Sequence, residues 1–304
     1  MAPEPSATVR NTADGEEAHQ GARRRHENSR FGAKTGLPIH APMSRESCAE
    51  GIGFYERALA QLNSSKLGTR HGASRAGRVG AAPAHDDCGY ADLGCTGQTD
   101  YQTPALDRLT AEGIRFTQAY ANSALCTNTR VALITGRYQY RLPIGLVEPL
   151  RWSDRQAPEM GVPSRFPTLP SLLRSAGYRT ALIGKWHLGY LPRYSPLKSG
   201  YGEFFGVMGG FTGYYTHIGD GGEHDLYEGE TPIERAGYVT DILSERAVAW
   251  IAAASALPEP YFLSLHYTAP HWPWSAPSVE AAARQREVER TELTEGETPA
   301  STAK

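Results

Sequence analysis

The sequence has few cysteines, no long hydrophobic run and almost no net charge, and each absence excludes a class of protein. Four cysteines in 304 residues are too few for a disulfide framework and lack the paired spacing of a metal site. The longest apolar run, Ala247–Ala254, is far shorter than the roughly 20 residues that a membrane-spanning helix needs. A formal charge of −2 creates no field that would recruit nucleic acid or an anionic membrane. We therefore expect no nucleic-acid partner and no membrane partner.

The two ends of the chain differ in composition from its middle. Residues 1–84 are rich in Ala, Gly, Arg and Ser, and only Tyr55–Leu62 has a helical pattern. Because so few aliphatic side chains cluster there, we expect a low-complexity, disordered extension, and a charged disordered tail at 276–304. The first thirty residues contain no apolar stretch of the kind that directs secretion, so the expected location is cytoplasmic.

Residues 85–275, the expected folded domain, alternate between helical and strand patterns. Apolar periodicity and capping residues predict helices at 103–113, 126–136, 168–176 and 238–255, and strands at 114–120, 179–184 and 261–267. Residues 141–167 and 200–227 are expected to be loops, and 78–83 is a poor strand. Alternation of this kind predicts an α/β fold with a mostly parallel sheet flanked by helices. Ligands of such sheets bind at the carboxyl ends of the strands.

The stretch that begins at Cys126 predicts a short helix with a cysteine at its positive end. Thr127 and Asn128 are favourable N-cap residues, and Gly136 is a stop signal. Cys126 and Arg130 are four residues apart and so share a helix face. The helix dipole and the guanidinium both favour a thiolate, and the same end of a helix binds oxyanions. This pattern indicates a nucleophile inside an anion site.

Three further groups of residues follow, or fall close to, predicted strand ends. Asp86 and Asp87 are adjacent acids that suit either a solvated turn or a hard cation such as Ca²⁺. Lys185 and His187 are two residues apart, which fits an oxyanion site with proton transfer, or an exposed lysine beside a packed histidine. His271 lies among prolines and tryptophans, either as a structural residue or in the wall of a pocket. His266, Cys88 and Cys95 are predicted to be buried packing residues.

These motifs, in this order, resemble the sulfatase family of the alkaline-phosphatase-like superfamily. The match runs from about Asp86 to Trp274 and covers the N-terminal catalytic part of that fold, so the chain looks truncated. Asp86-Asp87 with Gly89-Tyr90 resembles the first metal-binding motif, and Cys126 to Arg137 resembles the sulfatase signature. Gly177 to Gly189 looks like the second signature, and Tyr267 to Pro273 resembles the Ala-Pro-His segment. Asn128 differs from the family pattern, which usually has proline or alanine there.

The resemblance implies a sulfuric ester hydrolase of the arylsulfatase-like kind, acting on a small-molecule sulfate ester. Cys126 would be oxidised to formylglycine by a formylglycine-generating enzyme, and Arg130 would steady the resulting hydrate. Asp86 and Asp87, with the modified Cys126, would be ligands of one Ca²⁺ ion. His187 would take a proton, and Lys185 and His271 would grip the sulfate.

Two other functions remain open from the sequence. One is hydrolysis of a phosphoester or phosphonate, because the superfamily shares similar metal sites. The other is a catalytically silent fragment that only binds anions. Two aspartates supply few of the about six to eight oxygens that Ca²⁺ takes, so we expect low turnover from the chain as it stands.

Overall fold

A computed structural model describes residues 81–84, 86–147, 149–273 and 275. The predicted extension up to residue 80, its helix at Tyr55–Leu62 and the tail at 276–304 lie outside the described residues. Within the described ranges, no helix is long and apolar enough to cross a membrane.

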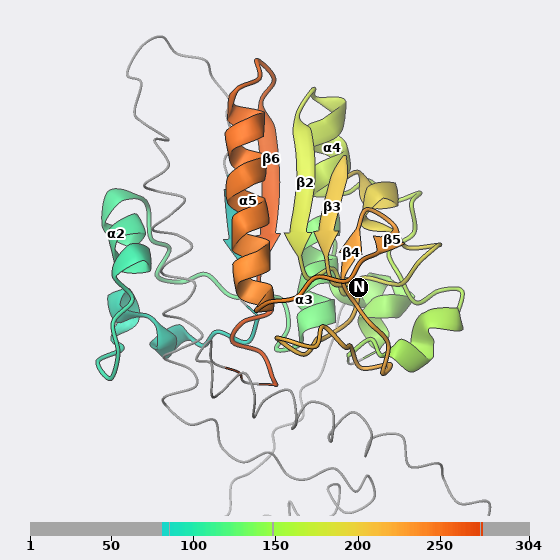
Figure 1. Ribbon diagram of the computed structural model, residues 1–304, viewed down its shortest axis with the longest axis horizontal. Coiled ribbons are helices and arrows are strands. Elements are labelled where there is room, and N and C mark those ends of the chain that lie inside the picture. The colour runs from blue at the N-terminus through green and yellow to red at the C-terminus, as the bar shows by residue number, and fades with distance from the viewer. Residues whose placement is uncertain (1–80, 85, 148, 274, 276–304) are drawn as a thin grey trace, which may run out of the picture. The chain divides into compact units, whose positions relative to one another are not determined.

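A twisted sheet forms the centre of the described fold (Figure 1). Its six strands follow the order β1-β6-β2-β3-β4-β5. Strands β1, β6, β2 and β3 are parallel, and β4 and β5 add an antiparallel edge. This confirms the predicted mostly parallel α/β sheet. The strands are β1 (Ala81–Ala84), β2 (Arg179–Gly184), β3 (Glu203–Gly206), β4 (Tyr227–Glu228), β5 (Thr231–Pro232) and β6 (Tyr261–His266).

Helices cover both faces of the sheet because its strands are apolar on both sides. Ala181 and Ile183 of β2 join one core cluster with α5, whereas Leu182, which points the other way, packs into a second cluster with α3. In Figure 1, α5 lies in front of the sheet and α3 lies near the carboxyl ends of the strands. The helices are α2 (Pro104–Glu112), α3 (Cys126–Thr135), α4 (Leu169–Ser175) and α5 (Val239–Ser255).

Short 3-10 turns supply much of the remaining local structure. They join the longer elements, and several stand in or beside the predicted loop at 141–167. They are η1 (Tyr90–Asp92), η2 (Gly94–Thr96), η3 (Gln139–Arg141), η4 (Pro143–Leu146), η5 (Trp152–Gln156) and η6 (Pro196–Ser199).

Strands β1 and β3 lie outside the strands that the sequence predicted. Residues 81–84, which overlap the poor strand at 78–83, pair in parallel with β6, with Ala81 opposite Leu263. An edge strand tolerates Pro83, because the missing N–H can face the unpaired side. Strand β3 lies inside the predicted loop at 200–227 and pairs with β2. Both strands depend on partners that are distant in sequence.

The predicted strand at 114–120 is wrong. Its side chains alternate, but the segment pairs with no described strand, and Ile114 and Phe116 are 85% and 77% exposed. Alternation defines a face without guaranteeing a partner for it. The predicted surface loop at 141–167 is also partly internal, since Leu142, Ile144 and Leu150 are buried in the second core cluster.

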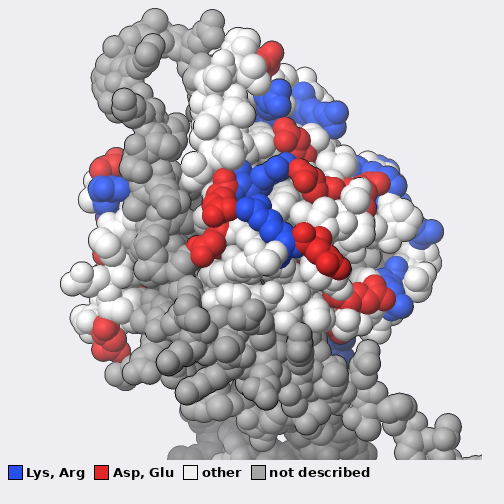
Figure 2. Space-filling view, in the orientation of Figure 1, with Lys and Arg blue, Asp and Glu red and all other residues white. Residues whose placement is uncertain are grey.

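The outer face of α5 and the adjoining hairpin carry mixed charge. Figure 2 shows acidic and basic side chains close together on the face seen there. Arg235 pairs with Glu245, and Arg246 pairs with Glu228, each at 2.6 Å. Exposed pairs of this kind contribute little to stability, typically about 0–1 kcal/mol.

Candidate active site

Helix α3 places Cys126 at its first position. Its N-cap is Leu125, and Gly136 ends it in the left-handed conformation at φ 61°, so the predicted helix and its stop are confirmed. The predicted caps are not: Thr127 and Asn128 lie inside the helix. Their side chains bond elsewhere, Thr127 to His187 and Asn128 to the Gly145 carbonyl.

The thiol of Cys126 faces the imidazole of His187. Sγ lies 3.2 Å from Nδ1, and the other ring nitrogen lies 2.8 Å from the carbonyl oxygen of Leu150. Because a carbonyl only accepts, Nε2 carries the proton and Nδ1 is the bare acceptor. Burial, and then the charge of Lys185, hold the pKa of His187 well below its usual range. A neutral imidazole therefore presents a free lone pair to the thiol.

His187 is held there by unusual backbone geometry. Its φ is +54°, a conformation that non-glycine residues adopt rarely and at a cost. Its N–H donates to the Met208 carbonyl, while the Lys185 N–H donates to the His266 carbonyl. Gly184 permits this close approach, since a Cβ there would lie 1.8 Å from the His266 oxygen. His187, in its left-handed conformation, turns the chain after β2, and the hydrogen bonds to Met208 and His266 fix this turn.

Asp86 is buried between two cations. Lys185 Nζ donates to one carboxylate oxygen, and Arg130 Nη2 lies 3.3 Å from the other. Burial alone would raise the pKa of Asp86, but the charges of Lys185 and Arg130 outweigh it and hold the pKa well below the usual range. Lys185 and Asp86 are 0% and 4% exposed, so the pair is shielded from water.

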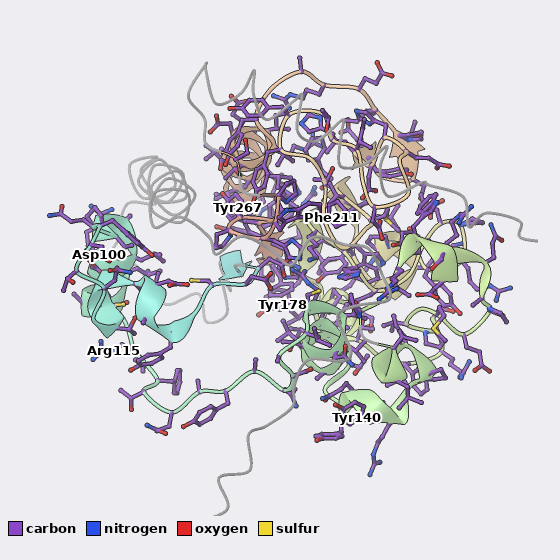
Figure 3. The ribbon with its side chains drawn as sticks, turned by 90° about the horizontal axis from the view of Figure 1, so that it is seen from below. Asp100, Arg115, Tyr140, Tyr178, Phe211 and Tyr267 are labelled. Atoms are coloured by element: carbon purple, nitrogen blue, oxygen red, sulfur yellow. The ribbon has the colours of Figure 1, made fainter. Side chains whose placement is uncertain are left out.

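Asp87 points away from this cluster. Its φ of 60° turns the chain directly after Asp86, and its carboxylate is half exposed, with Oδ2 3.6 Å from His271 Nε2. His271 stacks on Phe211, labelled in Figure 3, with ring centroids 6.4 Å apart. Burial and Lys185 lower the pKa of His271, so its contact with Asp87 is not a full ion pair at neutral pH.

The residues described do not supply a Ca²⁺ site by themselves. No group of three or more His, Cys, Asp or Glu within the described ranges could hold a metal ion. Both oxygens of Asp86 face cations, Asp87 turns to His271, and Cys126 Sγ contacts an imidazole. Since Ca²⁺ takes about six to eight oxygens, this donor set is too small and too fully neutralised.

Three contacts of the site were not predicted from the sequence. The hydroxyl of Thr127 lies 3.1 Å from His187 Nε2, the Leu150 carbonyl fixes the tautomer, and His266 contacts Arg130. No local signal marked them, because each joins residues at least 37 positions apart. His266 was predicted to be a packing residue, and instead it is half-buried and polar in its contacts.

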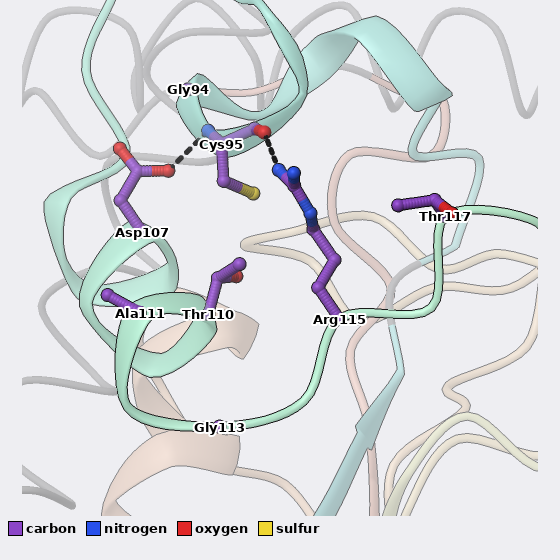
Figure 4. A pocket seen from close by; sticks show the side chains of 8 residues that line it. All are labelled: Gly94, Cys95, Asp107, Thr110, Ala111, Gly113, Arg115 and Thr117. Atoms are coloured by element: carbon purple, nitrogen blue, oxygen red, sulfur yellow. Dashed lines mark hydrogen bonds between the residues drawn. The ribbon is translucent and has the colours of Figure 1, made fainter.

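A separate hollow lies beside α2 (Figure 4). Cys95 and Arg115 are among its lining residues. The Cys95 N–H donates to Asp107 at 2.6 Å, and Arg115 donates to the Cys95 carbonyl. Cys88 and Cys95 were predicted to be buried, but both are half-buried. Neither contributes to the cluster around Cys126.

The fold and the site together define an α/β protein that carries a thiol, an imidazole and two cations at the carboxyl edge of a mostly parallel sheet. The model of the Sulfatase family matches residues 84–295, and the chain belongs to this family.

Curated relatives and a solved structure are consistent with this family membership. The chain is 33% identical to mouse (Mus musculus) N-acetylgalactosamine-6-sulfatase over 62% of its own length and 39% of that protein. It is 35% identical to mouse arylsulfatase J over 66% of its length and 35% of that protein. A structure in complex with its substrate D-glucosamine-2-N,6-O-disulfate matches with a TM-score of 0.53 and 29% identity, over 65% of this chain and 36% of that one. The chain thus spans well under half of these two relatives.

Proposed function

We propose that the chain carries the catalytic cluster of a sulfuric ester hydrolase, in which water cleaves a sulfate ester into an alcohol and sulfate. The proposal rests on the contact between Cys126 Sγ and His187 Nδ1 beside the buried Lys185 and Arg130. Membership of the Sulfatase family supports it. The names of its relatives, which include a sugar sulfatase and an arylsulfatase, support a small-molecule sulfate ester as substrate.

Cys126 is proposed as the precursor of a formylglycine, made by a formylglycine-generating enzyme. The position fits this role because the thiol is half-buried at a helix N-terminus, where N–H groups stabilise negative charge. Formylglycine would supply a hydrated aldehyde oxygen as the nucleophile for sulfur. The bare Nδ1 of His187 can hold a proton at that position, because the opposite nitrogen already donates to Leu150.

The buried cations fit the charge of the substrate. A sulfate ester is an anion, and charge grows on its leaving oxygen as the S–O bond breaks. Lys185 and Arg130 are the positive groups of the cluster, and His271 lies on its Asp87 side. We propose that these three residues bind the sulfate. Asp86 and Asp87 would be the carboxylates that face a Ca²⁺ ion, but within the described residues they do not complete a site for it.

The test is release of sulfate from an aryl sulfate by the chain co-produced with a formylglycine-generating enzyme. We expect slow turnover that depends on Cys126, because Lys185 is fully buried against Asp86 and Ca²⁺ lacks ligands. Cys126→Ala is the control and should reduce the rate to background. Equal rates in the two proteins would refute the proposal. Turnover of an aryl phosphate that exceeds that of the sulfate would assign the site to phosphoesters instead.

A further inference from the structure

His266 joins the ends of two neighbouring strands to helix α3. It is the last residue of β6, and its backbone oxygen accepts the N–H of Lys185 at 2.8 Å. Its side chain reaches Arg130, where Nδ1 lies 3.0 Å from Nη1. The same Nδ1 lies 3.3 Å from the carbonyl oxygen of Lys185.

These distances favour one tautomer of His266. A guanidinium nitrogen always donates and a carbonyl oxygen always accepts, so Nδ1 cannot satisfy both neighbours. Arg130 is the nearer of the two. The Lys185 carbonyl already accepts from Arg130 Nη1 at 2.8 Å. His266 therefore carries its proton on Nε2 and accepts from Arg130 through Nδ1.

An uncharged acceptor suits this place. Arg130 is 8% exposed, and a buried guanidinium needs acceptors for its five donors. Asp86 supplies a carboxylate, and the Lys185 carbonyl supplies a neutral oxygen. Burial, followed by the charge of Arg130, lowers the pKa of His266 to about 3, so the ring stays neutral at ordinary pH.

We propose that His266 is a positioning residue that fixes the plane of the Arg130 guanidinium by accepting a hydrogen bond at Nδ1. With the Lys185 carbonyl and Asp86 it holds the guanidinium from three different segments. Arg130 then stays on the face of α3 that it shares with Cys126, one turn away. The importance of this placement for turnover rests on the proposed function, but the hydrogen bond itself does not.

Nitrogen NMR of the full chain with ¹⁵N-labelled histidine tests the hydrogen bond without any activity. The variant His266→Asn identifies the signals by their loss. We expect Nδ1 of His266 to be unprotonated and Nε2 to carry the proton, with no titration between pH 8 and 5. In Arg130→Met, or in Arg130→Lys if the first variant does not fold, the Nδ1 signal should shift. Protonated Nδ1, ordinary titration near pH 6.5, or signals unchanged in the folded Arg130 variant would each overturn the proposal.

Kinetics with an aryl sulfate then test the positioning role. His266→Asn keeps an acceptor near the place of Nδ1, whereas His266→Leu has none. Because a hydrogen bond to a charged group is worth about 1.5–3 kcal/mol, His266→Leu should lower kcat about 10- to 100-fold with KM little changed. His266→Asn should recover most of kcat. Wild-type kcat in His266→Leu would overturn the role. An inactive wild-type chain would count against the proposed function alone, and the NMR result would still decide the hydrogen bond.

Discussion

Cys126 Sγ lies 3.2 Å from Nδ1 of His187, although the two residues are 61 positions apart. Helix α3 supplies the first residue and the turn after β2 supplies the second. The contact links the proposed precursor of the nucleophile to a neutral proton acceptor.

The pH dependence of turnover should reflect the lowered pKa of His187. Burial and Lys185 disfavour the charged ring, so the base form persists below the ordinary pKa of 6.5. The acidic limb of the kcat profile should therefore lie below pH 6.5. His187→Asn, which cannot act as the base, should lower kcat about 10²- to 10⁴-fold and abolish that limb. A limb at or above pH 6.5 in the wild type would contradict the assignment.

Breaking the buried pair of Lys185 and Asp86 should destabilise the fold strongly. Lys185→Met leaves Asp86 with Arg130 alone, and removing one partner of a buried pair costs about 3–5 kcal/mol. Urea unfolding measures the change. Arg179→Met is the matched control, because its pair with Glu203 is 44% exposed on both sides and should matter by less than about 1 kcal/mol. Similar losses in both variants would refute the burial argument.

Adding Ca²⁺ should change the Tm of the chain little. A bound ion stabilises the native state by mass action, but Asp86 is already neutralised and Asp87 faces His271. Thermal unfolding with Ca²⁺ and with a chelator measures the difference. A large Tm increase that is lost in Asp86→Asn would show that Ca²⁺ displaces Lys185, and our reading of the donor set would be wrong.

Asp225 should make stability fall as pH rises. Burial raises its pKa from 3.8 to about 7, so between these values the folded chain holds a proton that the unfolded chain has lost. This contribution is complete below pH 3.8 and disappears as pH approaches 7. Asp225→Asn abolishes it and gives up one of the acceptors for Met208 N and Gly209 N. Measured by urea unfolding, the free energy of unfolding of Asp225→Asn relative to that of wild type should be higher at pH 8 than at pH 5. If the free energies of unfolding of variant and wild type differed by the same amount at both pH values, the effect would be excluded.

Local signals predicted the helices well. Thr103 and Gly113 bound α2, Thr168 caps α4 through Ser171, and Gly136 ends α3. These devices work within a few residues, so the sequence displays them directly. For the same reason the motifs correctly placed Cys126 at the start of a helix and Lys185 and His187 directly after a strand.

Contacts between distant segments could not be read in this way. Strand β1 exists through β6, and residues 114–120 alternate without a partner. Thr127 looked like a cap, but His187 attracts its hydroxyl. His266 looked like a packing residue until α3 placed Arg130 beside it. In each case a partner distant in sequence decides the outcome, and periodicity contains no information about it.

The central claim is that Cys126 is the precursor of the nucleophile. Mass spectrometry of the peptide that contains residue 126 tests it directly, on chain co-produced with a formylglycine-generating enzyme, with Cys95 as the internal control. We predict the mass of formylglycine at residue 126 and an intact thiol at residue 95. An intact thiol at residue 126 in all of the protein would contradict the account.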